Sequence, residues 1–147
     1  MDQQFLPADG TLRVTAASLT IRPATGAEAI GAFAGWEDDL SRAVVAISRD
    51  IRLGLRGGQA VAVAGIVRID DGRLFLFFDV ADGGLSGSRD ALAIVRAARD
   101  MLEAQVEPVW TPCHVGKYPT APKLVALCGF HPTNEIIEDA QVWLRLP

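Results

Sequence analysis

The strongest constraint on the fold of this chain is a pair of nearly continuous apolar stretches in its middle. Residues 60–69 and 74–80 carry few polar side chains, and Asp71-Gly72 lies between them. Asp-Gly is a strong signal for a tight hairpin turn, so the two stretches are predicted to be neighbouring strands. A strand with so few polar residues is usually covered on both faces, so we predict that 60–69 is central in a sheet.

Other segments predict further strands and several helices around this hairpin. Thr25 stands three residues before Glu28, which is the spacing of a capping box, so a helix is predicted from near Gly26 to Gly35. Gly57-Gly58 predicts a second hairpin turn. The remaining predicted elements are strand material in 12–21 that ends at Arg22-Pro23, a helix from 37–39 to Ile47, a strand at 51–55, a helix at 89–105, a short strand at 109–110, a helix from Thr120 to Gly129, and strands at 136–137 and 142–146.

Length and composition predict one α/β domain of mixed type. The chain has 147 residues, and residues 1–10 are interpreted as a loose N-terminal arm. Fourteen Lys and Arg against 18 Asp and Glu give a net charge of −4. This acidic balance argues against non-specific binding to nucleic acid or to anionic lipid, so neither nucleic acid nor membrane is expected as a partner.

The cysteines and the N-terminus bear on compartment and metal content. Cys113 and Cys128 are too few for a disulfide scaffold, and their spacing with His114 and His131 matches no standard zinc pattern, so no metal is expected. The N-terminus has no basic region followed by an apolar run, which argues against a signal peptide. No apolar stretch approaches the roughly 20 residues of a membrane helix. We therefore expect a cytoplasmic location.

Three short segments give the chain a family resemblance. They are LTIRPAT at 19–25, GQAVAVAG at 58–65 and LVALCGF at 124–130. In this order they resemble the GNAT superfamily, the acetyl-coenzyme-A-dependent N-acetyltransferases, over nearly all of the chain after residue 11. The resemblance is closest to small GNAT-like proteins encoded by bacteriophages and prophages. It implies a mostly antiparallel twisted sheet of six to seven strands flanked by about four helices.

The resemblance also implies where a cofactor would bind. In that family a central strand, here 75–80, pairs with the pantetheine arm of acetyl-CoA, and a strand N–H polarises the thioester carbonyl. The diphosphate then lies on N–H groups of the following loop and first helical turn, here 83–89. The residues that the resemblance assigns to acetyl-CoA are Phe78, Val80, Gly84, Gly87, Ser88 and Arg89.

The loop departs from the usual pattern of the family. Residues 82–90 read DGGLSGSRD, and no frame reproduces Gln/Arg-x-x-Gly-x-Gly/Ala. Arg89 could neutralise a phosphate, whereas Asp82 and Asp90 would repel it. An alternative interpretation is a simple glycine-rich turn, with Ser88 capping the helix and Asp90 complementing its dipole.

Candidate catalytic residues are few. The family's tyrosine that protonates the leaving thiolate maps to Val125, so Tyr118 is considered as an acid from a displaced position; otherwise it is an amphipathic loop residue. His114 and Asp79 are the candidate general bases, although a loop histidine is often merely exposed. Burial would raise the pKa of an aspartate within an apolar strand.

Two functions remain open from the sequence. The first is an acetyl-CoA-dependent N-acetyltransferase whose partners are coenzyme A and an unknown amine. The second is a catalytically inactive GNAT-like binding or assembly module of phage or prophage origin, because a shared fold does not guarantee activity. Modification of nucleobases is disfavoured by the negative charge. The apolar run at 142–144 is interpreted as a sheet edge that favours a homodimer.

Overall fold

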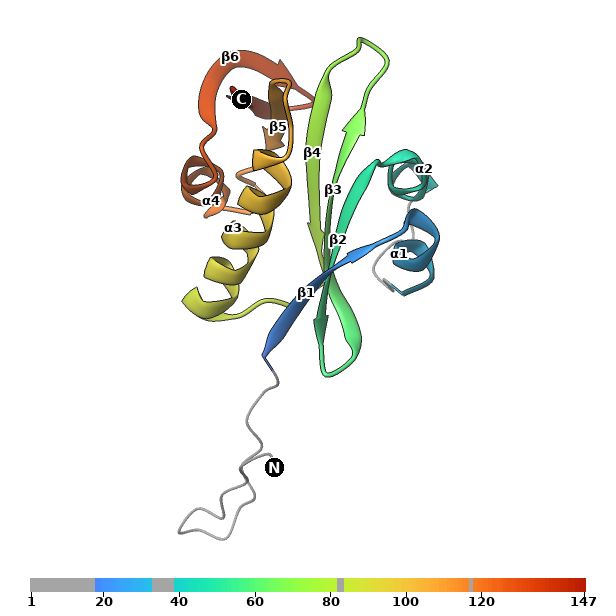
Figure 1. The fold of residues 1–147 in the computed structure, drawn as a ribbon. Coiled ribbons are helices and arrows are strands. Elements are labelled where there is room, and N and C mark those ends of the chain that lie inside the picture. The colour runs from blue at the N-terminus through green and yellow to red at the C-terminus, as the bar shows by residue number, and fades with distance from the viewer. Residues whose placement is uncertain (1–17, 33–38, 82–83, 117) are drawn as a thin grey trace, which may run out of the picture.

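The computed structural model describes residues 18–32, 39–81, 84–116 and 118–147. Within these residues seven strands form one sheet in the order β1-β2-β3-β4-β5-β7-β6, with four helices beside it (Figure 1). The fold class predicted from the sequence is confirmed. The elements are β1 (Leu19–Ala24), α1 (Gly26–Ala32), α2 (Asp39–Ile47), β2 (Asp50–Arg56), β3 (Gln59–Arg68), β4 (Leu74–Val80), α3 (Gly87–Glu103), β5 (Val109–Cys113), α4 (Ala121–Leu127), β6 (His131–Ile137) and β7 (Ala140–Arg145).

Local sequence signals account for several of these boundaries. The capping box is formed: Glu28 N–H donates to Thr25 Oγ1 at 3.1 Å, and Thr25 N–H donates to Glu28 Oε1 at 3.0 Å. Gly57 and Gly58 both have positive φ, as the predicted hairpin turn requires. β1 continues through Pro23 because it is an edge strand, where a missing N–H costs no ladder bond. The predicted end of α1 at Gly35 lies outside the described residues.

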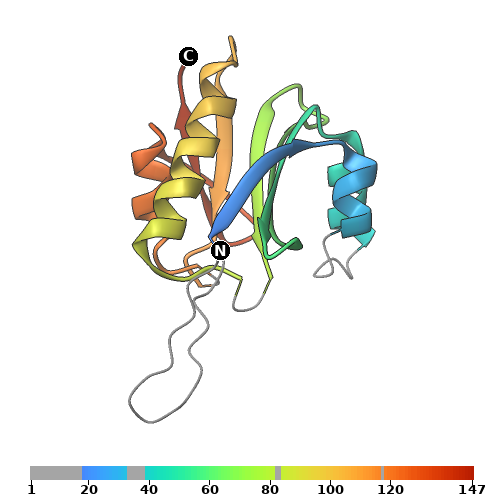
Figure 2. The ribbon, with the colours of Figure 1, turned by 60° about the horizontal axis from the view of Figure 1, so that its bottom comes forward.

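The sheet separates two helical layers. Figure 2 shows α1 and α2 on one side of the strands and α3 and α4 on the other. Val63 packs with Ala29 of α1 and Val45 of α2, whereas Ile66 packs with Met101 of α3. β3 therefore contributes to the core on both faces, which confirms its prediction as a central strand.

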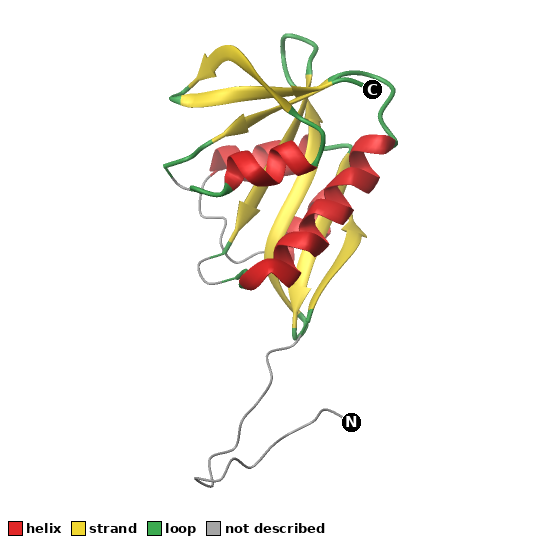
Figure 3. Cartoon of the chain, turned by 90° about the vertical axis from the view of Figure 1, so that its left-hand side faces the viewer, coloured by secondary structure: helices red, strands yellow, loops and turns green. Residues whose placement is uncertain are grey.

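The two helices on the second face are tied to the sheet at their C-terminal ends. Arg145 of β7 donates from Nε to the Cys128 carbonyl at 3.1 Å and from Nη1 to the Leu102 carbonyl at 3.2 Å. A cation at the C-terminal end of a helix also complements its dipole. Figure 3 shows α3 and α4 lying together on this face. Arg145 therefore helps to fix the position of both helices over the sheet.

The end of the chain is arranged differently from the sequence interpretation. β7 lies between β5 and β6, so the apolar run at 142–144 is inside the sheet and is not an edge. The interpretation of this run as an edge strand is wrong, because β6 extends from His131 to Ile137 and pairs with it. None of the helices in the described part of the chain is both long and apolar enough to cross a membrane.

Candidate functional site

The sheet opens where β4 and β5 meet. β4 pairs with β3 over seven residues, but it pairs with β5 only at Leu74↔Val109 and Phe75↔Trp110. Beyond that point β4 continues to Val80 and β5 to Cys113 without further pairing. We call this divergence the fork. It leaves one edge of a central strand uncovered by a neighbouring strand.

The closed end of the fork is held by Arg73. Its guanidinium carbon lies 5.0 Å from the ring centre of Phe75 and 5.2 Å from that of Trp110, the last pair before the strands diverge. The same guanidinium donates to Glu135 Oε1 at 2.7 Å and to Glu135 Oε2 at 2.9 Å. These hydrogen bonds raise the pKa of Arg73, with a second contribution from Asp71. The bidentate pair therefore connects the start of β4 to β6.

Hydrogen-bond alternation shows which groups of β4 face the fork. Ile69 N–H donates to the Arg73 carbonyl at 2.9 Å, and Ala81 N–H donates to the Val61 carbonyl at 2.8 Å. Because bonded pairs alternate in an antiparallel ladder, residues 75, 77 and 79 turn their backbone toward β3 and residues 76, 78 and 80 turn theirs toward the fork.

Two of the groups that face the fork already have local partners. The Leu76 carbonyl accepts the Thr111 hydroxyl at 2.9 Å, and Val80 N–H donates to Asp79 Oδ1 at 2.9 Å. Phe78 lies between them, and its N–H and carbonyl face the gap. Phe78 is therefore the residue of β4 best placed to bond a ligand through its backbone.

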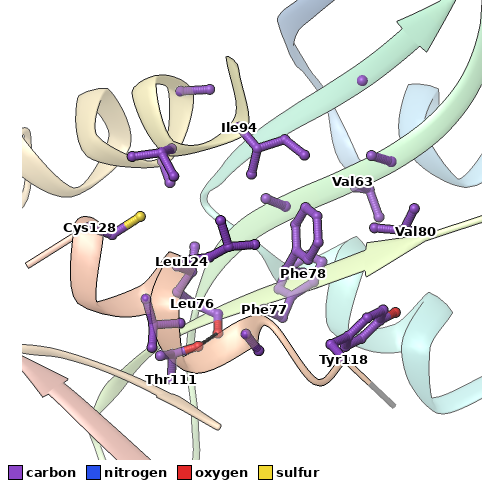
Figure 4. Close-up of a pocket in the computed structure, with 18 of the residues that line it drawn as sticks. Val63, Leu76, Phe77, Phe78, Val80, Ile94, Thr111, Tyr118, Leu124 and Cys128 are labelled. Atoms are coloured by element: carbon purple, nitrogen blue, oxygen red, sulfur yellow. Dashed lines mark hydrogen bonds between the residues drawn. The ribbon is translucent and has the colours of Figure 1, made fainter. Parts of the chain in front are cut away.

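A cavity of about 580 Å³ lies at the fork. Such a volume is within the range of small-molecule sites. Its walls are mostly apolar and come from the sheet and from both helices of the second face, as Figure 4 shows for Phe78 and Val80 of β4, Ile94 of α3 and Leu124 of α4. The cavity therefore suits an extended, largely apolar ligand.

Two of the three candidate catalytic residues line this cavity, and the third, Asp79, is hydrogen-bonded to one of them. Tyr118 and His114 line it, and the Tyr118 hydroxyl donates to Asp79 Oδ1 at 3.0 Å. The Tyr118 ring makes an edge contact with the Phe78 ring, with ring centres 6.4 Å apart. The backbone N–H of Tyr118 donates to the His114 carbonyl at 2.8 Å. Thus a phenol and a carboxylate 39 residues apart in the sequence are brought into contact beside the uncovered edge of β4.

Residues 84–86, just before α3, are held by a buried carboxylate. Asp90 accepts the Ser86 N–H at 2.8 Å and is ion-paired with Arg56. Arg56 also donates to the Gly84 carbonyl at 3.3 Å, and Gly84 N–H donates to the Ala81 carbonyl at 2.8 Å. Two of the main-chain donors expected for a diphosphate, on Gly84 and Ser86, are therefore used within the protein.

The remaining candidate N–H donors for a diphosphate lie at the start of α3. The helix begins at Gly87, and Ser86 occupies the N-cap position without a side-chain capping bond, so the alternative of Ser88 as the cap is wrong. The N–H groups of Gly87, Ser88 and Arg89 have no acceptor within the helix. Ser88 and Arg89 line a second cavity of about 610 Å³ between α3 and α4. Of the residues assigned to acetyl-CoA, Phe78, Val80 and Gly84 therefore line the first cavity, and Ser88 and Arg89 line the second.

The thiols near the site are poor nucleophiles. Cys128 lines the first cavity, and burial raises its pKa to about 11. Burial likewise raises the pKa of Cys113. Both are free and buried, so thiolate chemistry at neutral pH is not supported. In the described part of the chain no group of three or more His, Cys, Asp or Glu side chains is placed to hold a metal ion.

Arg56 was missed by the sequence reasoning. The signal lies on α3: Asp90 shares the spacing i, i+4, i+7, i+11 with Ile94, Ala97 and Met101, so the carboxylate is on the face that packs against the sheet. An acidic residue on a buried helix face requires a partner. The partner itself could not be chosen among the 14 basic residues without the register of β2.

Comparison with known proteins supports the fold and only the fold. Neither the protein-family models nor the curated proteins contain a match to this sequence. Solved structures do match, and three of them are 11 to 16% identical to this chain. An aminoglycoside acetyltransferase, AAC(6')-Ib in complex with paromomycin and acetyl-CoA, has 14% identity, covers 88% of this chain and 93% of its own, and gives a TM-score of 0.59.

Two further matches have the same character. The GNAT domain of S. lividans PAT has 16% identity, covers 97% of this chain and 94% of its own, with a TM-score of 0.60. A spermidine N-acetyltransferase SpeG chimera from Vibrio cholerae and hSSAT has 11% identity and a TM-score of 0.55. The match covers 88% of this chain and 96% of the chimera. The chain therefore has the fold of the GNAT acetyltransferases.

Proposed function

We propose that this protein is an acetyl-CoA-dependent N-acetyltransferase that acts on an amine. The observation that carries the proposal is the uncovered edge of β4 at Phe78, which faces a cavity of about 580 Å³. An extended, largely apolar chain that carries amide groups can add to such an edge by hydrogen bonds with the strand backbone, in the manner of a further strand. The pantetheine arm of coenzyme A has this chemistry.

The residues around the cavity fit the two parts of coenzyme A unequally. The fork accommodates the pantetheine arm through Phe78 and the apolar walls of Val80 and Leu124. For the diphosphate, the N–H groups of Gly87, Ser88 and Arg89 and the guanidinium of Arg89 are the available donors. Gly84 contributes close packing instead, because its N–H is used by Ala81 and a Cβ there would lie 2.8 Å from the Val61 carbonyl oxygen.

The side chains at the end of the cavity can supply the proton transfers. The Phe78 N–H donates to the thioester oxygen and stabilises the negative charge that develops there when the amine nitrogen bonds to the carbonyl carbon. Asp79 or His114 accepts the proton that the amine loses. Tyr118 donates its hydroxyl proton to the sulfur as the carbon–sulfur bond breaks, so the products are an amide and a thiol.

Binding and turnover are tested separately. Saturating acetyl-CoA is expected to raise the melting temperature, because a ligand at 100 times its Kd stabilises the folded state by about 2.7 kcal/mol. Release of free thiol is then followed with spermidine, kanamycin and a lysine peptide as acceptors. Spermidine is named in the description of one structural neighbour, and kanamycin is present in the complex of another. Absence of any thermal shift at millimolar acetyl-CoA would contradict the proposal.

The second candidate function is a GNAT-like module that has lost catalysis, of phage or prophage origin. Two observations favour the loss of catalysis: Val125 stands where the family's tyrosine is expected, and the Gly84 and Ser86 donors are used internally. This candidate predicts that coenzyme A binds weakly or not at all and that no acceptor increases thiol release. The predicted homodimer is tested separately, by measuring the mass of the full chain by sedimentation with and without coenzyme A.

A further inference from the structure

A single hydrogen-bonded network holds residues 84–86, which lead into α3. It joins Arg56, at the end of β2, to Asp90, in the first turn of α3, 34 residues later. Asp90 also accepts the Ser86 N–H, and Arg56 also donates to the Gly84 carbonyl. Arg56 thus holds the carbonyl of Gly84, and Asp90 holds the N–H of Ser86.

The network is largely shielded from water. The Asp90 side chain is 6% exposed and the Arg56 side chain 21%. Charge-assisted hydrogen bonds in such surroundings are stronger and more directional than exposed ones. Gly84 is held in addition by its N–H bond to Ala81, and a Cβ at this position would meet the Ala81 and Val61 carbonyl oxygens at 2.9 and 2.8 Å. Gly84 therefore has little room to move.

We propose that Arg56 and Asp90 are positioning residues for the diphosphate of acetyl-CoA. By occupying the Ser86 N–H and the Gly84 carbonyl, they set the course of the loop into α3 and leave the N–H groups of Gly87, Ser88 and Arg89 for the ligand. Arg56 also balances the charge of Asp90, so the carboxylate does not oppose the phosphates as the sequence suggested. This inference rests on the proposed function.

The direction in which one substitution changes the affinity for acetyl-CoA separates this role from a purely electrostatic one. Asp90→Ala removes a negative charge near the proposed phosphate position. If Asp90 acted only through its charge, the variant would bind acetyl-CoA more tightly. If Asp90 positions the loop, the variant binds it more weakly, because the Ser86 N–H and Arg56 lose their shared acceptor and the loop is no longer held.

The experiment compares two acyl donors by calorimetric titration. Acetyl-CoA carries the diphosphate, and S-acetylpantetheine has the same thioester arm without it. Arg56→Met and Asp90→Ala are each expected to raise the Kd for acetyl-CoA about tenfold, the effect of losing one hydrogen bond to a charged group. Both variants should bind S-acetylpantetheine as the unmodified protein does.

Two further variants serve as controls for folding and for charge. Arg56→Lys keeps the cation beside Asp90 and is expected to fold, while losing the simultaneous bonds to Gly84 and Asp90, so its loss is smaller but still confined to acetyl-CoA. Arg68→Met removes the same charge from an exposed pair with Glu107 and should change neither affinity.

The outcomes distinguish this inference from the proposed function. Tighter binding of acetyl-CoA by Asp90→Ala, or equal losses for both donors in Asp90→Ala and Arg56→Lys, would overturn the positioning role while leaving the acetyltransferase proposal in place. If the unmodified protein bound neither donor, the proposed function would fail and the positioning role would fail with it.

Discussion

The two edges of β4 differ in how far they are paired: one edge contributes to the stability of the sheet, and the other is the candidate binding edge. On the β3 side, seven residue pairs run the length of the strand, and Ile66, Leu74 and Leu76 among them are buried in the core. On the β5 side, pairing ends after Phe75 and Trp110, and a cavity begins. The same strand is thus a structural element along one edge and a candidate binding element along the other.

This difference shows how a rigid strand can present its backbone to a ligand. An uncovered strand edge usually risks pairing with other chains. Here it lies inside the molecule, between α3 and α4, so an extended ligand can reach it through the cavity. The β3 side holds Phe78 in place, and the β5 side leaves its N–H and carbonyl for bonding.

The largest expected effect comes from disturbing the paired edge. Ile66 of β3 is fully buried and lies opposite Leu76. Ile66→Ala should lower the free energy of unfolding by about 3 kcal/mol, because it leaves a cavity in the core. Urea unfolding measures this, with Val106→Ala, at an 87% exposed position, as the matched control. A loss no greater than that of the control would contradict the central role of β3.

The next effect concerns the uncovered edge. Tyr118→Phe keeps the ring contact with Phe78 and removes the hydroxyl that bonds Asp79. The kcat for acetyl transfer should fall about a hundredfold with little change in KM, since a proton donor acts in the transition state. The melting temperature should stay nearly constant. A kcat equal to that of the unmodified protein would remove Tyr118 from the mechanism.

The paired edge was predictable from the sequence because its signals are local. Asp71-Gly72 and the two apolar stretches beside it predicted the β3–β4 hairpin and the exact bounds of β4, and the Thr25–Glu28 capping box placed the start of α1. These features depend on residues within a few positions of one another. Their physical causes, turn geometry and helix capping, operate without the rest of the fold.

The uncovered edge was predictable only through the family resemblance. The fork depends on where β5 stops pairing with β4, and β7 was misplaced at an edge because its neighbours are set by register across the sheet. The contacts of Asp90 with Arg56 and of Tyr118 with Asp79 span 34 and 39 residues. No local pattern specifies such partners, although the position of Asp90 on the buried face of α3 indicated that one was needed.

A smaller effect is expected at the cavity thiol. The pKa of Cys128 is raised to about 11 by burial, so the thiol stays protonated at pH 8 and alkylation is slow, rising with pH. Acetyl-CoA at ten times its Kd should slow the labelling of Cys128 about tenfold, because the bound state protects the cavity. Cys113, which does not line the cavity, is the internal reference in a mass-spectrometric time course. Equal protection of both thiols would argue against binding in the fork.

The smallest effect concerns the closed end of the fork. The hydrogen bonds from Arg73 lower the pKa of Glu135. The pair therefore stabilises the fold above the ordinary pKa of a glutamate, and this contribution is lost as the pH falls through the lowered value. Glu135→Gln should flatten the dependence of unfolding free energy on pH between about pH 5 and pH 3. Urea unfolding at a series of pH values tests this, with Glu103→Gln at an exposed position as the control. The same dependence of unfolding free energy on pH in both variants would contradict the prediction.

The most direct test of the account measures amide hydrogen exchange along β4, without and with saturating coenzyme A. Because bonded groups alternate, the Phe77 and Asp79 amides should exchange slowly in both states, whereas the Phe78 amide should exchange rapidly in the ligand-free protein and slow when coenzyme A binds. A Phe78 amide that is already protected without ligand, or that is unchanged by bound coenzyme A, would contradict the claim that this edge of β4 is the binding element.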